Sequence, residues 1–295
     1  MPEIIVAKSA GYCFGVKRAV NIVQEQVRGQ SESASQGKPA KTIYTLGPLI
    51  HNKQVIRDLS EQGVVTLADE SALESVRDGI VIIRSHGVKR SVYTYLEEHG
   101  IECIDATCPF VERIHKIVCE EEKKGNRVVV IGNPDHPEVQ GICGWCDGPV
   151  DVIRNADEAK AYKAPKDRRL SIVVQTTFQE NNFKEIVELL ARKGYNTVVL
   201  DTICDATRRR QEEAAKIASQ VDVMLVVGDA SSSNTQKLFE ICNTCCTNTY
   251  FVQIPEELDL NLVMSVKTVG ITAGASTPNY IIEEVQKHVR RKDFV

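Results

Sequence analysis

The sequence predicts an α/β protein of three small domains related by a pseudo-threefold repeat, each a mostly parallel sheet with helices, around a central cavity. Three observations support this prediction. A cysteine lies between a strand-like and a helix-like run three times, with 95 positions from Cys13 to Cys108 and 96 from Cys108 to Cys204. Polar loops recur at matching distances behind these cysteines. Short apolar strands alternate with helices, which is typical of parallel sheets.

Two polar loops in each copy lie in phase. The residues that mark the first loop follow their cysteines by 38, 28 and 28 positions: His51, His136 and Ser232. The longer first interval contains a polar segment, 29–41, which we interpret as an exposed loop insertion. The residues that mark the second loop follow by 73, 68 and 72 positions: His86, Thr176 and Ser276. Such agreement indicates an internal repeat.

The periodicity of apolar residues predicts the elements of each copy in turn. The first copy has predicted helices over 16–27, 55–62 and 91–99 and strands over 43–46, 64–67, 80–84 and 102–105. The second has strands over 127–131, 171–174 and 198–201 and helices over 111–124 and 181–193. The third has strands over 221–227 and 266–271 and helices over 208–220 and 280–290. Pro109 suits the first helical position, so Cys108 is expected at the N-cap.

The third copy ends without its last strand, whereas the run 4–7 is a strand without a copy of its own. We therefore expect residues 1–13 to complete the third domain. The predicted domains are 14–108, 109–203, and 204–295 with 1–13. Because loops at the carboxyl ends of parallel strands collect ligands, this arrangement would direct the cysteines and polar loops at one cavity.

Composition indicates the compartment and excludes some partners. A net charge of −4 gives no reason to expect nucleic acid or an anionic membrane as a partner. Apolar runs such as 221–227 are far shorter than the ~20 residues of a membrane span. Met1-Pro2-Glu3 leads into a strand without a basic signal region, so we expect a cytoplasmic protein. Ten cysteines in such a chain favour metal binding or catalysis over disulfides.

Cys13, Cys108 and Cys204 are the candidate metal ligands. At a helix start, free N–H groups and the helix dipole favour the thiolate, which is the form that binds metals. A closed structural zinc takes four ligands, whereas a cubane iron–sulfur cluster with three thiolates keeps one iron open. Any one of these cysteines alone could be an ordinary buried side chain. Their equal spacing favours one shared site, which we interpret as the active site.

The polar loops are candidates for binding a diphosphate, because backbone N–H groups and helix N-termini hold anions. Their side chains add hydrogen bonds without a fixed cage of lysines. The candidate residues are His51, His86, His136, Ser232, Ser233, Asn234 and Ser276. A single histidine of this set could instead be a satisfied structural side chain. Three of the chain's six histidines at loop positions of the repeat favour function.

Glu138 is the candidate proton donor, because it lies in a polar loop two positions beyond His136. Thr176 or Thr177 could relay the proton or orient the carboxyl group. The alternative interpretation is an exposed glutamate that caps a helix.

Other motifs are assigned no catalytic role. Cys143 and Cys146 form a C-x-x-C motif, and the run 242–246 contains another. Either could be a redox dithiol, and together they could bind zinc. They do not occupy matching positions in the repeat, which argues against both functions. The basic run 208–210 is interpreted as a solvated helix face that could also help to dock an acidic electron donor.

A series of motifs in order along nearly the whole chain resembles the IspH/LytB family of 4-hydroxy-3-methylbut-2-enyl diphosphate reductases. The motifs are Ala10-Gly11-Tyr12-Cys13-Phe14-Gly15-Val16, Gly47-Pro48 through His51-Asn52, Ser85-His86-Gly87-Val88, Asp105-Ala106-Thr107-Cys108-Pro109, His136-Pro137-Glu138-Val139, Gln175-Thr176-Thr177, Thr202-Ile203-Cys204, Ser232-Ser233-Asn234-Thr235 and Thr272-Ala273-Gly274-Ala275-Ser276. The segment 29–41, the C-x-x-C motifs and Asn133-Pro134 depart from the family pattern.

The resemblance implies the last step of the methylerythritol phosphate route to isoprenoids. It implies one [4Fe–4S] cluster per chain on Cys13, Cys108 and Cys204, with an open iron that binds the substrate hydroxyl. The loop residues given above would hold the diphosphate, and Glu138, Thr176 and Thr177 would be the catalytic residues. Electrons would come singly from a ferredoxin or flavodoxin. The products would be isopentenyl diphosphate and dimethylallyl diphosphate.

Two rival functions come from other classes. A non-redox hydro-lyase could also use an open iron to bind a hydroxyl, but it would turn over without a reductant. A non-enzymatic iron–sulfur or zinc sensor could hold a small regulator in the same cavity. A sensor usually needs an output surface, and the sequence contains no basic recognition helix or linked domain.

Overall fold

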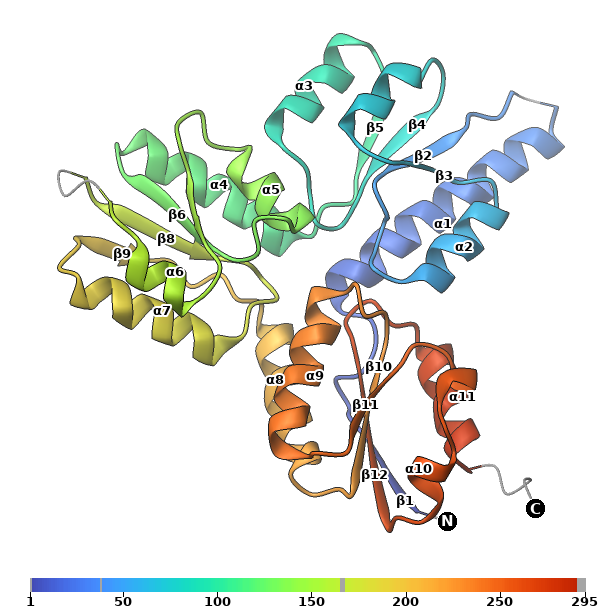
Figure 1. Cartoon of the computed structure of the whole chain (residues 1–295). Coiled ribbons are helices and arrows are strands. Elements are labelled where there is room, and N and C mark those ends of the chain that lie inside the picture. Colours follow the sequence, from blue (N-terminus) through green and yellow to red (C-terminus); the bar gives the residue numbers. More distant parts are fainter. Residues whose placement is uncertain (1, 38, 165–167, 291–295) are drawn as a thin grey trace. The chain divides into compact units, whose positions relative to one another are not determined.

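The computed structural model describes residues 2–37, 39–164 and 168–290 and contains three four-stranded sheets flanked by helices (Figure 1). All strand pairs within these described ranges are parallel, which confirms the predicted α/β class. The first sheet has the order β3 (Val65–Leu67), β2 (Ile43–Leu46), β4 (Ile80–Ile83), β5 (Glu102–Asp105). The second has the order β7 (Asp151–Ile153), β6 (Arg127–Ile131), β8 (Leu170–Val174), β9 (Thr197–Val199).

The third sheet confirms that the amino-terminal strand completes the last copy of the repeat. Its order is β11 (Thr249–Val252), β10 (Val223–Val227), β12 (Thr268–Ala273), β1 (Glu3–Val6). β1 pairs with β12 from Glu3 opposite Thr268 to Val6 opposite Ile271. If the strands of each copy are counted along the repeat, every sheet has the order second, first, third, fourth. Strands β7 and β11 were not predicted, and they occupy the position that β3 has in the first sheet.

The helices connect these strands as parallel pairing requires. The helices of the first copy are α1 (Phe14–Ser35), α2 (Lys53–Glu61), the 3₁₀ turn η1 (Glu70–Ser75) and α3 (Arg90–Glu98). Those of the second are α4 (Pro109–Lys123), α5 (Pro137–Cys143), α6 (Ala156–Ala161) and α7 (Glu180–Arg192). Those of the third are α8 (Asp205–Ala218), α9 (Ser233–Cys245), η2 (Pro255–Glu257), α10 (Asn261–Met264) and α11 (Asn279–Arg290). Every residue of the inner strands β4, β8 and β10 is buried, because side chains pack on both faces.

The prediction of an exposed loop over 29–41 was wrong for its first half, because α1 continues to Ser35. The hydroxyl of Ser31 donates to the Val27 carbonyl at 2.9 Å, so this serine bonds within the helix rather than ending it. The stop comes at Gly37, whose φ of +72° is readily adopted only by glycine. A polar sequence therefore forms an exposed helix until a residue of suitable backbone geometry ends it.

The described residues form two compact units. The first unit takes its residues from Met1–Phe14, His51–Lys53 and Cys204–Val295, and the second from Gly15–Ile50 and Gln54–Ile203. The three domain limits drawn from the repeat, and the central cavity, stay predictions.

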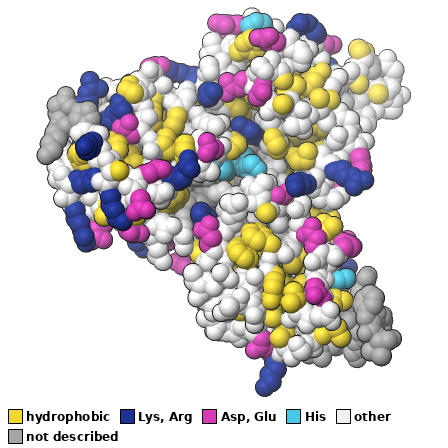
Figure 2. Space-filling view, viewed as in Figure 1, with side chains coloured by type: hydrophobic (Ala, Val, Ile, Leu, Met, Phe, Trp, Pro, Cys, Tyr) yellow, Lys and Arg dark blue, Asp and Glu magenta, His cyan; other side chains and the backbone are white. Residues whose placement is uncertain are grey.

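The surface shows no strong excess of one charge on the face in Figure 2. Lysine and arginine side chains are interspersed there with aspartate and glutamate, in keeping with the net charge of −4. Among the described helices, none combines the length and the apolar character that a bilayer crossing requires.

Candidate active site

The first unit brings two candidate metal ligands together. Cys13 follows β1, and its backbone N–H donates to the carbonyl of Ala275 at 3.2 Å. Cys204 is the N-cap residue of α8. Burial raises the pKa of the Cys204 thiol, and the neighbouring Cys13 contributes to the shift. The backbone N–H groups of Ala206 and Thr207 oppose it by donating to the sulfur, which stabilises the metal-binding thiolate.

The third candidate ligand, Cys108, lies in the second unit. It is the N-cap residue of α4 with Pro109 at the first helical position, as predicted. Its backbone N–H donates to the carbonyl of Ser85 at 3.0 Å, which ties it to the loop after β4. A Cβ atom at Gly15 would overlap the Cys108 sulfur and lie 2.9 Å from the Cys108 Cβ. The glycine therefore leaves the space that this thiol needs.

The donor chemistry of the three cysteines fits an iron–sulfur cluster. None of the three forms a disulfide within the described part of the chain, and all are half-buried. Each directly precedes a helix, α1, α4 or α8, whose first turn supplies N–H groups. Cys13 acts on the pKa of Cys204 within one unit. The meeting of Cys108 with this pair stays a prediction.

Candidate diphosphate residues of the first unit meet where β10 and β12 end. Ser232 is the N-cap of α9, directly before Ser233, and its hydroxyl accepts from a backbone N–H of the first turn. The Ser276 hydroxyl donates to the carbonyl of His51 at 2.8 Å. It also lies 3.5 Å from the Ser232 hydroxyl. Loops from three parts of the chain thus meet at two hydroxyl groups, which are suitable hydrogen-bond donors to phosphate.

Asn234 joins this group to the Cys13 turn. Its Oδ1 accepts from the backbone N–H of Ala275 at 2.9 Å, and the carbonyl of Ala275 accepts from the backbone N–H of Cys13. The Nδ2 group of Asn234 is buried and has no hydrogen-bond partner among the described residues. A buried donor without a partner costs free energy unless a ligand accepts from it, so Asn234 fits an anion-binding role.

Two candidate histidines meet in the second unit. His86 follows β4 and His136 is the N-cap residue of α5, and their ring centroids lie 5.4 Å apart in an edge-to-face arrangement. Nδ1 of His136 accepts from the backbone N–H of Glu138 at 3.1 Å. In the neutral ring the proton is therefore on Nε2, which makes that nitrogen a hydrogen-bond donor.

Glu138 is buried with Thr176 as its partner. Only 2% of the Glu138 surface is exposed, which contradicts the alternative of an exposed capping residue. The backbone N–H and the hydroxyl of Thr176 each donate to its carboxyl group at 2.7 Å. Burial raises the pKa of Glu138, although both hydrogen bonds act against the shift. A carboxyl group of raised pKa remains a proton donor at higher pH.

Thr177, the neighbour of Thr176, is held by Gln175. Nε2 of Gln175 donates to the Thr177 hydroxyl at 3.1 Å. Oε1 of Gln175 accepts from the backbone N–H of Asn133, also at 3.1 Å. Gln175 therefore joins the loop after β6 to the loop after β8. Its place in a Gln-Thr-Thr motif was the only sequence signal for this function.

The loop that carries His86 rests on aromatic side chains that sequence reasoning missed. The indole N–H of Trp145 donates to the carbonyl of Val88 at 2.9 Å. His115 stacks on Trp145 with 4.8 Å between ring centroids and 14° between planes. A Cβ at Gly87 would lie 2.7 Å from Cε1 of His115, so the loop backbone contacts this ring directly. The Cys143–Cys146 motif therefore supplies, through Trp145, a packing element.

The prediction of a solvated basic run was wrong for Arg210, which is only 3% exposed. Arg209 beside it is exposed, as expected. The difference follows from helical geometry, because neighbours on a helix face different directions. The sequence signal was the position of Arg210 on the apolar side of α8, close to Ala214 and Ile217.

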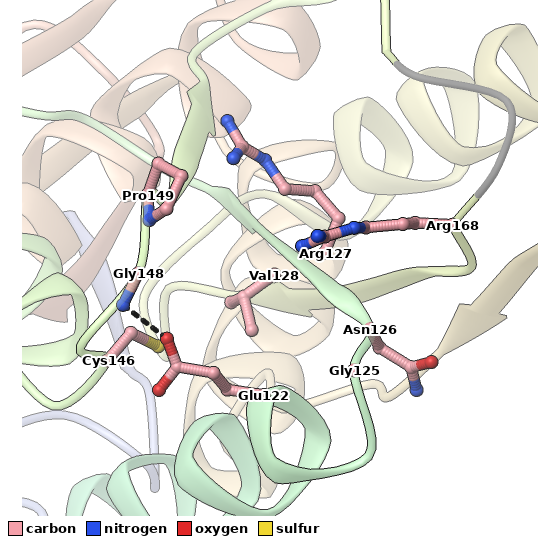
Figure 3. A pocket seen from close by; sticks show the side chains of 9 residues that line it. All are labelled: Glu122, Gly125, Asn126, Arg127, Val128, Cys146, Gly148, Pro149 and Arg168. Atoms are coloured by element: carbon pink, nitrogen blue, oxygen red, sulfur yellow. Dashed lines mark hydrogen bonds between the residues drawn. The ribbon is translucent and has the colours of Figure 1, made fainter.

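A separate pocket in the second unit lies at the amino end of β6 (Figure 3), whereas the candidate site residues follow carboxyl ends. Its lining residues are Glu122, Gly125, Asn126, Arg127, Val128, Cys146, Gly148, Pro149 and Arg168. The Glu122 carboxylate accepts from the backbone N–H of Gly148, and Arg127 pairs with Asp151 at 2.6 Å. These charged groups are engaged within the protein, so the pocket is assigned no part in the site.

Comparisons with known proteins match the whole chain. The model of the LytB protein family matches residues 4–290. A protein of Thermoanaerobacter sp. named 4-hydroxy-3-methylbut-2-enyl diphosphate reductase is 42% identical over 288 residues, which are 98% of this chain and 96% of that protein. A protein of the same name from Alkaliphilus oremlandii is 44% identical over 284 residues, or 96% of this chain and 97% of the other.

Solved structures agree with these sequence matches. The structure of the E-1-hydroxy-2-methyl-but-2-enyl-4-diphosphate reductase from Plasmodium falciparum has a TM-score of 0.88 at 28% identity and covers 98% of this chain and 87% of that one. A second structure is described as (E)-4-hydroxy-3-methyl-but-2-enyl diphosphate reductase, the terminal enzyme of the non-mevalonate pathway. Its TM-score is 0.67 at 39% identity, with 98% of this chain and 99% of that one covered.

Proposed function

The chain belongs to the LytB family and is an oxidoreductase, and from this premise we propose that it reduces 4-hydroxy-3-methylbut-2-enyl diphosphate to isopentenyl diphosphate and dimethylallyl diphosphate. This is the terminal step of the methylerythritol phosphate pathway. Two electrons and two protons enter, the carbon–oxygen bond breaks, and water leaves. The match of the family model over residues 4–290 carries the proposal.

The proposed cofactor is one [4Fe–4S] cluster held by Cys13, Cys108 and Cys204. When bound, it would supply single electrons and, at an iron without a protein ligand, a Lewis acid for the substrate alcohol. The helix N-terminal N–H groups at Cys204 and the space left by Gly15 beside Cys108 support this ligand set.

The proposed proton donor is Glu138. One proton must reach the leaving hydroxyl group and the other the allylic carbon chain. Thr176 holds both carboxyl oxygens of Glu138 in place, and burial keeps the group protonated at a higher pH than an exposed glutamate. Thr177, fixed by Gln175, is proposed to orient the substrate beside this pair.

The proposed diphosphate site uses hydrogen-bond donors rather than a cage of lysines. The donor groups are the imidazoles of His51, His86 and His136, the hydroxyls of Ser232, Ser233 and Ser276, and the amide of Asn234. The unpartnered Nδ2 of Asn234 and the start of the 13-residue helix α9 support this role. Hydrogen bonds to a charged phosphate are about twice as strong as those between neutral groups.

The proposed electron donor is a ferredoxin or flavodoxin, and the proposed compartment is the cytoplasm. Exposed groups in the first turn of α4 suit an acidic carrier that docks near Cys108. Phe110 is 44% exposed, and Arg113 is exposed one turn later. An apolar ring beside a cationic side chain provides contact area together with electrostatic attraction.

The test is turnover by anaerobically reconstituted protein with dithionite and a dye mediator. Iron and sulfide should be bound, and 4-hydroxy-3-methylbut-2-enyl diphosphate should be consumed only when the reductant is present. Loss of substrate without reductant would identify the hydro-lyase instead. Zinc without iron and sulfide, or a fully loaded cluster that consumes no substrate, would contradict the proposal and favour a sensor.

A further inference from the structure

Arg210 is a buried cation that crosses the first unit next to the Cys13 turn. It lies on α8, six positions after Cys204, and is 3% exposed. Its Nη1 donates to the carbonyl of Ala273 at 2.8 Å and its Nη2 to the carbonyl of Gly11 at 2.9 Å. Its Nε is buried and has no partner among the described residues.

The two carbonyls that Arg210 contacts are those that position Cys13. Gly11 precedes Cys13 by two positions, and Ala273 is the last residue of β12. The loop that follows Ala273 contains Ala275, which accepts the backbone hydrogen bond of Cys13. The planar guanidinium group therefore holds both segments that determine where the Cys13 sulfur lies.

No carboxylate neutralises Arg210 among the described residues. Glu213, on the same helix, is the one carboxylate that influences it. That side chain already accepts from the backbone N–H groups of Lys8 and Ser9 at 2.9 and 2.8 Å. A buried positive charge that is held only by neutral carbonyl groups is costly, so an anion beside it would stabilise the folded protein.

Two cysteines act on the charge of Arg210 in addition to Glu213. Burial lowers the pKa of Arg210, whereas Cys13, Glu213 and Cys204 each raise it. Both cysteines, Cys13 and Cys204, are proposed cluster ligands. Thiolates that carry an iron–sulfur cluster would provide the missing negative charge, and that charge grows by one unit on reduction.

We propose that Arg210 has two roles. As a positioning residue it fixes the Cys13 turn, and as the fixed counter-charge of the iron–sulfur cluster it raises the cluster's reduction potential. This inference rests on the proposed cofactor. A fixed positive charge in a buried, low-dielectric site stabilises the more negative, reduced state. The position of the Cys13 turn depends on the two hydrogen bonds of Arg210, whereas the reduction potential depends on its charge. Substitutions can therefore separate the two roles.

The experiment compares Arg210→Lys, which keeps the charge, with Arg210→Gln, which keeps a donor but removes the charge. Arg209→Gln is the matched control, because it removes the same charge from an exposed position one residue away. The midpoint potential of the reconstituted cluster is measured by redox titration with electron paramagnetic resonance. We expect Arg210→Gln to shift it to more negative values and Arg210→Lys and Arg209→Gln to leave it near that of the wild type.

The half-time of cluster loss under a chelator provides a second measurement if Arg210→Gln loads poorly. Faster loss from Arg210→Gln than from Arg210→Lys supports the counter-charge. An unchanged potential in Arg210→Gln, or equal effects of the two Arg210 substitutions on potential or retention, overturns it. The iron and sulfide content of the wild-type protein is measured before any variant is compared. A wild-type protein that binds neither contradicts the proposed function itself.

Discussion

The carboxyl group of Glu138 accepts two hydrogen bonds from Thr176, one from the backbone N–H and one from the hydroxyl, each 2.7 Å long. The two residues are 38 positions apart; Glu138 lies in the first turn of α5, which follows β6, and Thr176 lies two positions after the end of the neighbouring strand β8. A buried carboxyl group with fixed orientation and raised pKa is suited to deliver a proton rather than to bind a cation.

Replacing Glu138 by glutamine should remove this proton donor while preserving its shape. We expect kcat to fall by about 10²- to 10⁴-fold, the usual contribution of a general acid. The cluster content, measured as iron and sulfide, should not change. Wild-type kcat in Glu138→Gln would contradict the assignment.

The Thr176→Val variant tests the same pair through pH. The Thr176 hydroxyl bond lowers the pKa of Glu138, so its removal should raise that pKa further. Because the protonated acid is the active form, the decline of kcat at alkaline pH should begin at a higher pH than in the wild type. A profile of kcat against pH with a supplied reductant measures the shift. An unchanged or opposite shift would show that another group sets this limb.

The Gly15→Ala variant should weaken cluster binding without unfolding α1. The added methyl group would overlap the Cys108 sulfur, so the thiol must move. Gly29→Ala on the same helix is the control, because a Cβ there meets no atom within 4 Å. Alanine in place of glycine within a helix stabilises by roughly 0.5–1 kcal/mol, so the control should be slightly more stable. Iron and sulfide per chain should fall only in Gly15→Ala, and equal cluster content in both variants would argue against Cys108 as a ligand.

His115 should make the protein sensitive to acid. Burial lowers its pKa to about 4, from an ordinary value near 6.5 in the unfolded chain. The neutral ring is therefore favoured by folding. The contribution of His115 to the free energy of unfolding is fully present above pH 6.5. It is lost as the pH falls towards 4, by up to about 3 kcal/mol.

Urea unfolding of the metal-free protein from pH 7.5 to 4.5 measures this effect. His115→Phe keeps an aromatic ring beside Trp145 and should lose part of the decline in midpoint. His99→Phe is the control, because His99 is exposed, and its profile should follow the wild type. Identical profiles for His115→Phe and the wild type would exclude His115 as the sensitive group.

The thiols of Cys143 and Cys146 should react slowly with iodoacetamide at pH 7. Burial raises their pKa values to about 11 and about 12, so both are neutral. Cys245 is exposed and should be labelled earlier. The double variant Cys143→Ser, Cys146→Ser should keep its cluster and activity. Loss of a bound metal from this variant would instead support the zinc or redox interpretation of the motif.

The repeat in the sequence was sufficient to predict three parallel sheets and the completion of the third by β1, but not the edge strands β7 and β11. Apolar strands and their spacing are local properties, and parallel pairing leaves few ways to connect them. Cys108 at a helix N-cap also followed locally, from Pro109. The end of α1 did not, because Ser31 forms a hydrogen bond within the helix that only the folded backbone makes visible.

The sequence by itself determined the chemical types available to the site: three thiols, several imidazoles and hydroxyls, and one nearby carboxyl group. Tertiary structure alone decided which of these groups are buried and paired. It assigned Thr176 rather than Thr177 to Glu138, and it buried Arg210 while leaving Arg209 exposed. Burial and pairing depend on contacts between segments far apart in the chain, whereas residue type and periodicity are local properties of the sequence.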